Sequence, residues 1–392
     1  MEEKNVIITD IRVNIIGDRE DVNPDKGGVE PLAIVRIDTD EGSVGYAESF
    51  RVPPGVARAV MMGKDSFFGK QIVGQQITHP ERLWQKMYDS MLHYNRRGWA
   101  LMCLGALDIA IWDLYGKQQN QPVYELLGGA QRCYFQTPES HPTIEVIPYC
   151  TIVSDQWDNV SMIESQIERG LKLQQLGYRA FKVEPMMSSV RNIVKLATKA
   201  REALGSDAIL AVDVGYRFND VQTCVRICQV LEELDIYFFE TPFPVDSFEP
   251  YAKLAAQTTI PLAMGEHAVS RWECLQMIEF GQVSVVQPYM NTVGGITEAK
   301  RIVENAKDRG VMVIPGNWST QILGAATVQL AAYSPITPLI EFAPAEIFDS
   351  PLRLDLQNLG HPVVGGAIQL PTSPGIGIEI PDELIQQYEL SL

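Results

Sequence analysis

Eight short apolar runs recur at intervals of about 25 to 30 residues from residue 146 onward. Each run is rich in β-branched or aromatic residues and is followed by a polar break with Gly or Pro and then by a segment with helical spacing. Parallel strands, which are buried on both faces, read as continuous apolar runs of this kind. Eight such strand–helix units close a TIM barrel, which we predict over residues 146–352. The runs read IPYCTIV, RAFKVEP, AILAVDVG, IYFFETPF, PLAMGEH, VSVVQPY, VMVIPGN and LIEFA.

An open, doubly wound α/β sheet is the competing fold. Its dinucleotide-binding fingerprint needs a G-x-G-x-x-G spacing directly after a strand. The only glycine pair after a predicted strand, Gly294-Gly295, lacks that spacing. The sequence therefore favours the closed barrel.

The residues before the barrel predict a smaller α+β domain over residues 1–130. VIITDIRVNII, PLAIVRIDTD and SVGYAESF predict an antiparallel meander with a polar loop at residues 17–31, and residues 80–118 predict two helices. The segment 130–145 is rich in Pro, Ser and Thr and marks the domain boundary. We expect the tail, residues 353–392, to return to the N-terminal domain.

The charge balance narrows the choice of partners. The formal net charge is −17, and the sequence holds no concentrated basic patch. Nucleic acid and anionic membranes would be repelled by such a chain, which leaves small molecules as the expected partners. The N-terminus lacks the regions of a signal peptide and no apolar run reaches the length of a membrane span, so we predict a cytoplasmic protein.

The cysteines form no C-x-x-C pair and lie mostly within apolar segments. This pattern indicates reduced, packed thiols rather than disulfides or a metal site. They are Cys103, Cys133, Cys150, Cys224, Cys228 and Cys274.

Three consecutive barrel runs end in an acidic residue: Asp213, Glu240 and Glu266. The carboxyl ends of barrel strands meet at one rim, where barrel active sites lie. Three carboxylates at one rim repel each other unless a cation compensates them, and Mg²⁺ prefers oxygen ligands. We therefore predict a Mg²⁺ site. The alternative is that each acid caps the next helix or pairs with a surface lysine.

These acids, the segments RGWALMCLGALDIAIWDLYGK and PVYELLGG, and VGGITEAKRI after the sixth strand together resemble the mandelate racemase branch of the enolase superfamily. The resemblance covers nearly the whole chain. It implies an α+β cap, completed by the C-terminal tail, over a modified TIM barrel of the (β/α)7β type, with Asp213, Glu240 and Glu266 as ligands of Mg²⁺. It also implies removal of the proton α to a substrate carboxylate, and a symmetric homo-oligomer, dimer or octamer.

The acid/base positions that are usual in this family are changed here. The second strand reads Lys182-Val183-Glu184, where the resemblance leads us to expect a Lys-x-Lys pair. Tyr289 stands after the sixth strand in place of an aspartate, and Gly316 stands after the seventh strand in place of a histidine. Because residues two apart in a strand face the same side, Lys182 and Glu184 should both point into the barrel mouth.

Four residues are candidates for proton transfer. Lys182 is the first candidate base, and the alternative is that it only pairs with Glu184 or polarises the substrate carboxylate. Glu184 can act as a base if burial raises its pKa, or else add a ligand for metal or substrate. His267, next to the third predicted metal ligand, is a candidate acid or base unless strand alternation turns it into packing. Tyr289 is a candidate donor to a leaving hydroxyl, or only a wall of the site.

Other residues are candidates for substrate binding. Tyr216 is a possible hydrogen-bond donor in the loop after Asp213. Glu341, at the end of the eighth strand, matches a family glutamate that hydrogen-bonds the substrate carboxylate. Arg51 and the pair Arg96-Arg97 are candidates for contact with an anionic substrate, and surface or inter-subunit salt bridges are the alternative.

Together these features predict a Mg²⁺-dependent lyase that dehydrates a sugar acid. A racemase or epimerase of a hydroxy acid is the first alternative, and it needs a base on each face of the carbon. A barrel that binds Mg²⁺ and a carboxylate without turnover is the second, because a fold does not fix an activity. A metal-assisted aldolase is the third.

Overall fold

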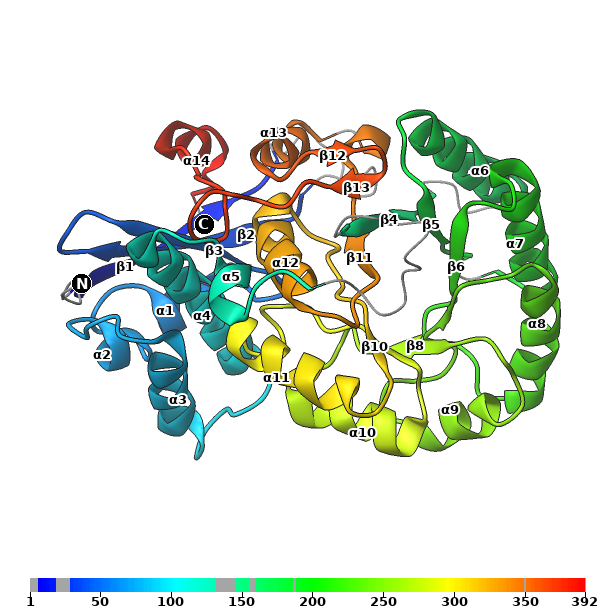
Figure 1. The fold of residues 1–392 in the computed structure, drawn as a ribbon, viewed down its shortest axis with the longest axis horizontal. Coiled ribbons are helices and arrows are strands. Elements are labelled where there is room, and N and C mark those ends of the chain that lie inside the picture. Colours follow the sequence, from blue (N-terminus) through cyan, green and yellow to red (C-terminus); the bar gives the residue numbers. More distant parts are fainter. Residues whose placement is uncertain are drawn as a thin grey trace.

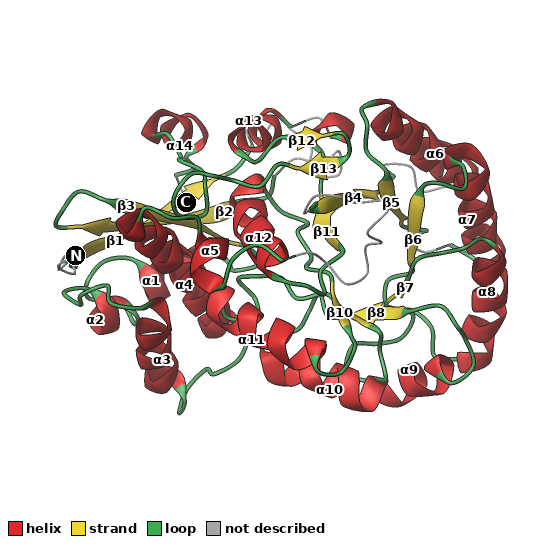
Figure 2. Cartoon of the chain, in the orientation of Figure 1, coloured by secondary structure: helices red, strands yellow, loops and turns green. Residues whose placement is uncertain are grey.

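A small sheet with helices lies beside a ring of strands that is enclosed by helices (Figures 1 and 2). Most of the predicted loop at residues 17–31 and of the boundary at residues 130–145 lies outside the described residues, as does Cys133. The other five cysteines are free and buried, as the sequence indicated. The computed structural model describes residues 6–18, 29–131, 145–154, 159–185, 188–348 and 350–391.

The N-terminal sheet is antiparallel, with strand order β1-β2-β3. Its strands are β1 (Ile8–Ile16), β2 (Leu32–Thr39) and β3 (Val44–Ser49). A tight turn joins β2 to β3, where Thr39 N donates to Ser43 O at 3.2 Å. The helices that follow are α1 (Pro54–Met61), α2 (Gly69–Ile72), α3 (Pro80–Met91), α4 (Trp99–Gln119) and α5 (Val123–Leu127).

The barrel is an eight-stranded parallel sheet in the order β10-β9-β8-β7-β6-β5-β4-β11. Its two ends meet because Glu341 N donates to Pro315 O at 3.0 Å and Val313 N donates to Ile336 O at 3.1 Å. This architecture confirms the predicted α/β fold class. The strands are β4 (Ile147–Ile152), β5 (Ala180–Val183), β6 (Ile209–Asp213), β7 (Phe239–Glu240), β8 (Leu262–Met264), β9 (Val285–Val286), β10 (Met312–Val313) and β11 (Leu339–Phe342).

A helix follows each of the first seven barrel strands, and several of these helices begin at a capping side chain. Asp220 accepts from Gln222 N and Thr223 N, and Ser270 accepts from Glu273 N, which satisfies amides that the first helical turn leaves free. The helices are α6 (Asn159–Gln175), α7 (Val190–Leu204), α8 (Val221–Glu233), α9 (Phe248–Ala255), α10 (Arg271–Gly281), α11 (Ile296–Lys307) and α12 (Gln321–Tyr333).

The C-terminal tail lies against the N-terminal sheet. Leu390 N donates to Ile15 O at 2.8 Å and Gly17 N donates to Tyr388 O at 3.1 Å. The chain thus returns to β1 after leaving the barrel (Figure 1). The elements after β11 are η2 (Ala345–Ile347), α13 (Pro351–Leu359), β12 (Val363–Val364), β13 (Ala367–Ile368) and α14 (Asp382–Tyr388).

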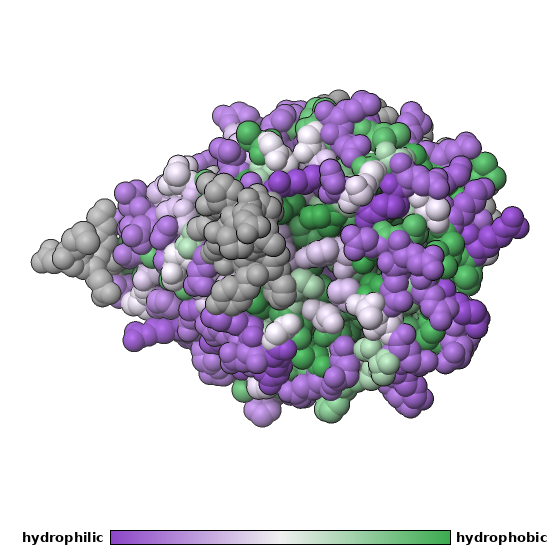
Figure 3. Space-filling view, turned by 45° about the vertical axis from the view of Figure 1, so that its right-hand side comes forward, coloured by the Kyte–Doolittle hydropathy of each residue, from purple (hydrophilic) through white to green (hydrophobic). Residues whose placement is uncertain are grey.

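Helix α4 is long and apolar enough to meet the length and hydropathy of a membrane span, contrary to the expectation that no segment does. However, 83% of its most apolar window is buried inside the protein. It packs against β3, β2 and α3. A helix that is apolar all round is expected in such a central position. The outer surface is different, because polar side chains cover most of the face shown in Figure 3.

Asp108 of α4 joins the N-terminal domain to the barrel. It is fully buried and accepts hydrogen bonds from Thr297 N at 2.9 Å and Thr297 Oγ1 at 2.7 Å. Trp112, one turn further along α4, donates from Nε1 to Thr297 Oγ1 at 2.9 Å. Thr297 lies in the first turn of α11, so Asp108 satisfies an amide that this helix leaves free.

Two glycines allow this close contact. A Cβ atom at Gly105 would lie 2.1 Å from Asn291 O, and a Cβ atom at Gly295 would lie 2.4 Å from Asp108 Oδ2. Gly295 also has φ of +90°, which glycine adopts without strain. The segments GALD and VGGIT, which carried part of the family resemblance, therefore pack against each other.

We predict that Asp108→Ala lowers the free energy of unfolding by about 2 to 3 kcal/mol, because Thr297 N would be buried without an acceptor. Asp108→Asn should cost less, because its amide oxygen can still accept from Thr297 N. Urea denaturation measures both, with the exposed Asp246→Asn as the control. An Asp108→Ala protein as stable as the wild type would contradict the role of this joint.

Burial also raises the pKa of Asp108 to about 7, above the value of about 3.9 for an unfolded chain. Between about pH 4 and about pH 7, Asp108 is therefore protonated in the native state and ionised in the unfolded chain. Its protonation contributes to the free energy of unfolding fully below about pH 4, and this contribution is lost as the pH rises through about 7. The stability of Asp108→Asn relative to wild type should improve between about pH 5 and about pH 8. A constant difference over this range would contradict the raised pKa.

Candidate active site

Lys182 lies at the centre of the carboxyl ends of the barrel strands. Its side chain, on β5, is only 3% exposed. Nζ lies 2.9 Å from Glu240 Oε2, 3.3 Å from Glu341 Oε1, 3.6 Å from Asp213 Oδ2 and 3.7 Å from Glu184 Oε1. Three of the acids lie in β6, β7 and β11, and Glu184 directly follows β5. The register of the parallel strands thus brings four carboxyl groups to one ammonium group.

Burial governs the electrostatics of this group. Burial raises the pKa of Asp213 and raises the pKa of Glu240 well above its usual value, against the opposing effect of Lys182. Burial alone would lower the pKa of Lys182, but Glu240 and the other anionic neighbours hold it well above its usual value. Burial raises the pKa of Glu184 to about 8. These raised pKa values show that the single charge of Lys182 does not fully compensate the acids around it.

Glu266 belongs to a second, more exposed cluster. Arg51 Nη2 donates to Glu266 Oε2 at 2.9 Å, Arg51 Nη1 donates to Glu266 O at 2.8 Å, and the Tyr216 hydroxyl donates to Glu266 Oε1. Burial alone would raise the pKa of Glu266, but Arg51 and Tyr216 bring it below its usual value. This carboxylate is therefore held ionised by the cap and by the loop after β6.

His267 faces the same cluster instead of turning into packing. Nδ1 lies 3.2 Å from Arg51 Nη1 and Nε2 lies 3.5 Å from Glu266 Oε1. Because arginine only donates, Nδ1 is the acceptor in the first contact, which leaves the proton of the neutral ring on Nε2. Burial and the positive charge of Arg51 lower the pKa of His267. At 44% exposure, its side chain lies at the outer edge of the site.

The cap supplies Arg51 through the segment that follows β3. Glu48, fully buried at the end of β3, accepts hydrogen bonds from Ser319 and Thr320 in the loop before α12. The carbonyl of Phe50 accepts from Asn291 Nδ2 at 2.8 Å. These contacts fix the segment on the barrel, and Arg51 reaches over the rim from it.

Three of the site residues or their neighbours have positive φ although they are not glycines: Arg51 (60°), Tyr216 (59°) and Thr241 (47°). Backbone conformations of this kind cost free energy and persist where the surrounding structure enforces them. Here the hydrogen bond from Thr241 Oγ1 to Asp213 Oδ1, at 2.6 Å, is part of that structure.

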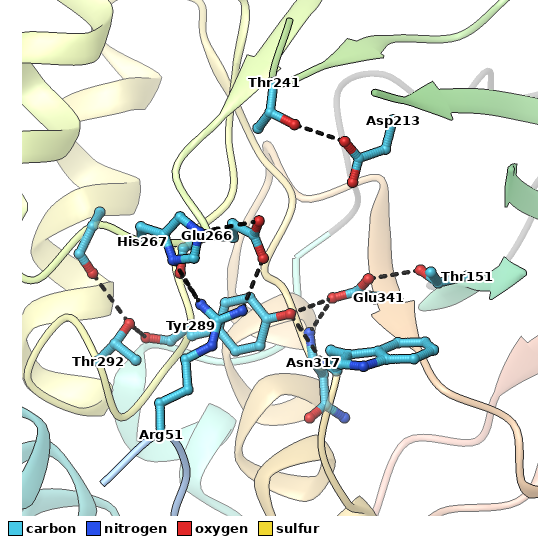
Figure 4. A network of polar contacts seen from close by, with 12 residues as sticks. Arg51, Thr151, Asp213, Thr241, Glu266, His267, Tyr289, Thr292, Asn317 and Glu341 are labelled. Carbon is cyan, nitrogen blue, oxygen red and sulfur yellow. Dashed lines mark hydrogen bonds and ion pairs between the residues drawn. The ribbon is translucent and has the colours of Figure 1, made fainter. Parts of the chain in front are cut away.

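Glu341 connects the group around Lys182 to a further set of hydrogen bonds (Figure 4). Its Oε1 accepts from Thr151 Oγ1 at 2.6 Å, besides its contact with Lys182. Its Oε2 accepts from the Tyr289 hydroxyl at 2.9 Å and from Asn317 N at 2.8 Å. The two oxygens of Glu341 thus face different partners on opposite sides of the carboxylate.

The structure brings most of the sequence-predicted site residues together, in one group around Lys182 and one around Glu266. Arg96 and Arg97 are not among them, since Arg96 is exposed and Arg97 Nε lies 3.6 Å from Glu273 Oε1. Sequence reasoning missed residues whose only signal is a polar side chain at the end of a buried strand or in a rim loop. These residues are Glu48, Thr151, Thr241 and Asn317.

The donor set fits a hard divalent cation, because it offers several buried carboxyl oxygens that one lysine does not fully compensate. Within the described part of the chain, no three His, Cys, Asp or Glu side chains form a finished metal site. Lys182 pairs with Asp213 and Glu240, whereas Arg51 and Tyr216 hold Glu266. The ammonium group of Lys182 already lies between carboxylates as a monovalent cation.

Comparison with known proteins gives several relatives of nearly full length. The chain is 29% identical over 381 residues to an arabinonate dehydratase of Saccharolobus solfataricus, covering 95% of both chains. It is 28% identical over 365 residues to a D-galactarolactone cycloisomerase of Agrobacterium fabrum, covering 91% of both. A crystal structure of a 3,6-anhydro-D-galactonate cycloisomerase from Zobellia galactanivorans superposes with a TM-score of 0.83 at 26% identity, covering 98% of this chain and 100% of the other.

Family models match both parts of the chain. Residues 26–128 match the mandelate racemase / muconate lactonizing enzyme N-terminal domain, and residues 166–384 match the enolase C-terminal domain-like family. The first match covers β2, β3 and the helices α1 to α5, and the second covers most of the barrel, so they confirm the resemblance that the sequence motifs indicated. This chain belongs to the mandelate racemase-like branch of the enolase superfamily.

Proposed function

We propose that this protein is a Mg²⁺-dependent lyase that removes the proton α to the carboxylate of a sugar acid and expels the β-hydroxyl as water. The relative named arabinonate dehydratase supports this reaction class. The observation that carries the proposal is the position of Lys182, whose Nζ lies 2.9 Å from Glu240 and 3.6 Å from Asp213. It puts an amine beside two of the three carboxylates that we propose as metal ligands.

Lys182 is the base in this proposal. A divalent cation on Asp213 and Glu240 would offset the carboxylates that raise the pKa of Lys182 in the metal-free site, so Nζ could lose its proton to solvent and then, as the free amine, take the α-proton. The electron pair of the broken C–H bond would pass into the substrate carboxylate as an enediolate. Asp213, Glu240 and Glu266 would hold Mg²⁺, which would supply positive charge to stabilise this dianion. Arg51, fixed against Glu266, adds a second cation at the rim.

Glu184 is the acid. Its side chain lies beside Lys182, 3.7 Å away, and its pKa of about 8 keeps it protonated near neutral pH. As the double bond forms between the α and β carbons, the C–O bond breaks and the leaving hydroxyl takes the proton of Glu184. Because the base and the acid come from one strand, the proton and the hydroxyl leave from the same face of the substrate.

His267, Tyr216 and Glu341 complete the substrate site in this proposal. His267 and Tyr216 lie along the more exposed edge, where the hydroxyls of a sugar acid can reach them. Glu341 contacts Lys182, with Oε1 at 3.3 Å from Nζ. The substrate is accordingly a small, polar, anionic molecule.

A cycloisomerase is the second candidate, because two of the relatives carry that name. The same groups serve this reaction when the leaving oxygen belongs to a ring of the substrate. The oxygen then stays attached to the product, which has the mass of the substrate. The mass of the product therefore separates the two candidates, since a dehydratase product is lighter by one water.

The first test follows the α-proton by NMR in D₂O with Mg²⁺ across aldonic acids, aldaric acids and their lactones. The wild type should exchange or eliminate with at least one substrate. Lys182→Ala should lose exchange and elimination together, by about 10³-fold or more, whereas Glu184→Gln should keep exchange and lose elimination by about 10² to 10⁴-fold.

The exposed Lys195→Ala is the matched control for loss of a lysine. Exchange that persists in Lys182→Ala would rule out Lys182 as the base. Exchange without any elimination or isomerisation product in the wild type would point to a racemase or epimerase instead.

The second test measures the metal directly. Chelation should abolish turnover and added Mg²⁺ should restore it, and calorimetry should detect one strong Mg²⁺ site. Asp213→Asn and Glu240→Gln should each weaken Mg²⁺ binding at least about tenfold, because a hard cation loses a charged oxygen ligand.

The exposed Glu249→Gln, on α9, is the control for loss of a carboxylate. Unchanged Mg²⁺ affinity in both rim variants would show that the metal, if it binds, binds elsewhere.

A further inference from the structure

We propose that Tyr289 and Gly316 form one interlocked unit in which Tyr289 is a positioning residue: its hydroxyl orients Glu341 and its ring supports Arg51. The effect on turnover rests on the proposed function, whereas the interlock itself does not. Both residues stand at positions where the family resemblance led us to expect other side chains, and the structure brings them into contact.

The contact is a steric one. Tyr289 follows β9 and Gly316 follows β10, and the two residues pair as a parallel β-bridge. A Cβ atom at Gly316 would lie 2.1 Å from Cε2 and 2.6 Å from Cδ2 of Tyr289. Real side-chain atoms do not approach so closely, so the ring occupies the space of any side chain at residue 316. A tyrosine in this rotamer after β9 requires glycine after β10.

The ring cannot move away easily, because it is covered on its other side. Tyr289 is 1% exposed. Its ring stacks on Phe50, with 5.4 Å between centroids and 23° between planes, and the guanidinium carbon of Arg51 lies 4.7 Å from its centroid. The ring is therefore held between a glycine of the barrel and two residues of the cap.

The hydroxyl of Tyr289 orients Glu341 together with Thr151 Oγ1 and Asn317 N. It accepts a hydrogen bond from Trp318 N at 3.1 Å and donates its own proton to Glu341 Oε2 at 2.9 Å. With Oε2 held in this way, Oε1 is the oxygen that faces Lys182 Nζ, at 3.3 Å. Tyr289 thus influences the position of Lys182 Nζ indirectly, through the orientation of the Glu341 carboxylate.

The face of the ring supports a different group. Arg51 lies over it and, from there, reaches Glu266 Oε2 at 2.9 Å. A cation over an aromatic ring is stabilised by the ring quadrupole, more so when solvent is excluded. Loss of the hydroxyl and displacement of the ring should therefore have different consequences, the first at Glu341 and the second at both Glu341 and Glu266.

The interlock is tested by a double-mutant cycle on thermal stability. Gly316→Ala should lower Tm in the wild-type background but have little effect when combined with Tyr289→Ala, because the smaller side chain leaves room for the added methyl group. Gly55→Ala is the matched control, since a Cβ atom there meets nothing within 4 Å. Additive losses of Tm in the cycle would overturn the interlock.

The positioning role is tested by a second pair of variants. Tyr289→Phe should keep Mg²⁺ affinity, measured by calorimetry, and lower kcat by about 10- to 100-fold, as loss of an orienting hydrogen bond does. It should lower Tm less than Gly316→Ala does, because it removes two hydrogen bonds without a steric clash. Gly316→Ala should lower Mg²⁺ affinity as well as kcat. A wild-type kcat in Tyr289→Phe, or wild-type Mg²⁺ affinity in Gly316→Ala, would overturn the proposed role. If the wild type turns over no substrate, the proposed function fails while the Tm cycle and the Mg²⁺ titration still decide the interlock.

Discussion

The contact between one buried ammonium group and a ring of buried carboxylates is the interaction on which this site depends. Lys182 is 3% exposed and lies within 4 Å of acids from four parts of the barrel. Buried charges are costly without partners, so removal of one member leaves the others uncompensated. Burial and the neighbouring Asp213 raise the pKa of Glu240 despite the lysine, so a divalent cation can displace protons from these acids and bind in addition to the lysine.

The cap is as necessary to this arrangement as the barrel. Asp108 ties α4 to the first turn of α11, and Glu48 ties the end of β3 to the loop before α12. Both acids lie in the cap and accept hydrogen bonds from groups at the amino ends of barrel helices. The contact of Glu48 lies three residues before Arg51, whose guanidinium group binds Glu266. A disturbance of the cap therefore changes the position of a cation at the rim of the barrel.

The sequence predicted the fold well because its main signal is local. Continuous apolar runs mark strands that are buried on both faces, and the acids that end them lie at the rim by the geometry of a parallel barrel. The contact of Arg51 with Glu266 could not be predicted, because it depends on how the cap sits on the barrel. The interlock of Tyr289 with Gly316 was equally hidden, since each residue alone reads as a departure from the family pattern. Steric exclusion between neighbouring strands becomes visible only when both positions are known in space.

A crystal structure of the protein with Mn²⁺ in place of Mg²⁺, with the ion located by anomalous scattering, would show whether the acids at the rim bind the metal. We expect one ion bound by oxygens of Asp213, Glu240 and Glu266, with Lys182 Nζ released from Glu240. An ion bound at other residues, or a protein that holds no ion at saturating Mn²⁺ while Lys182 keeps its contact with Glu240, would contradict it.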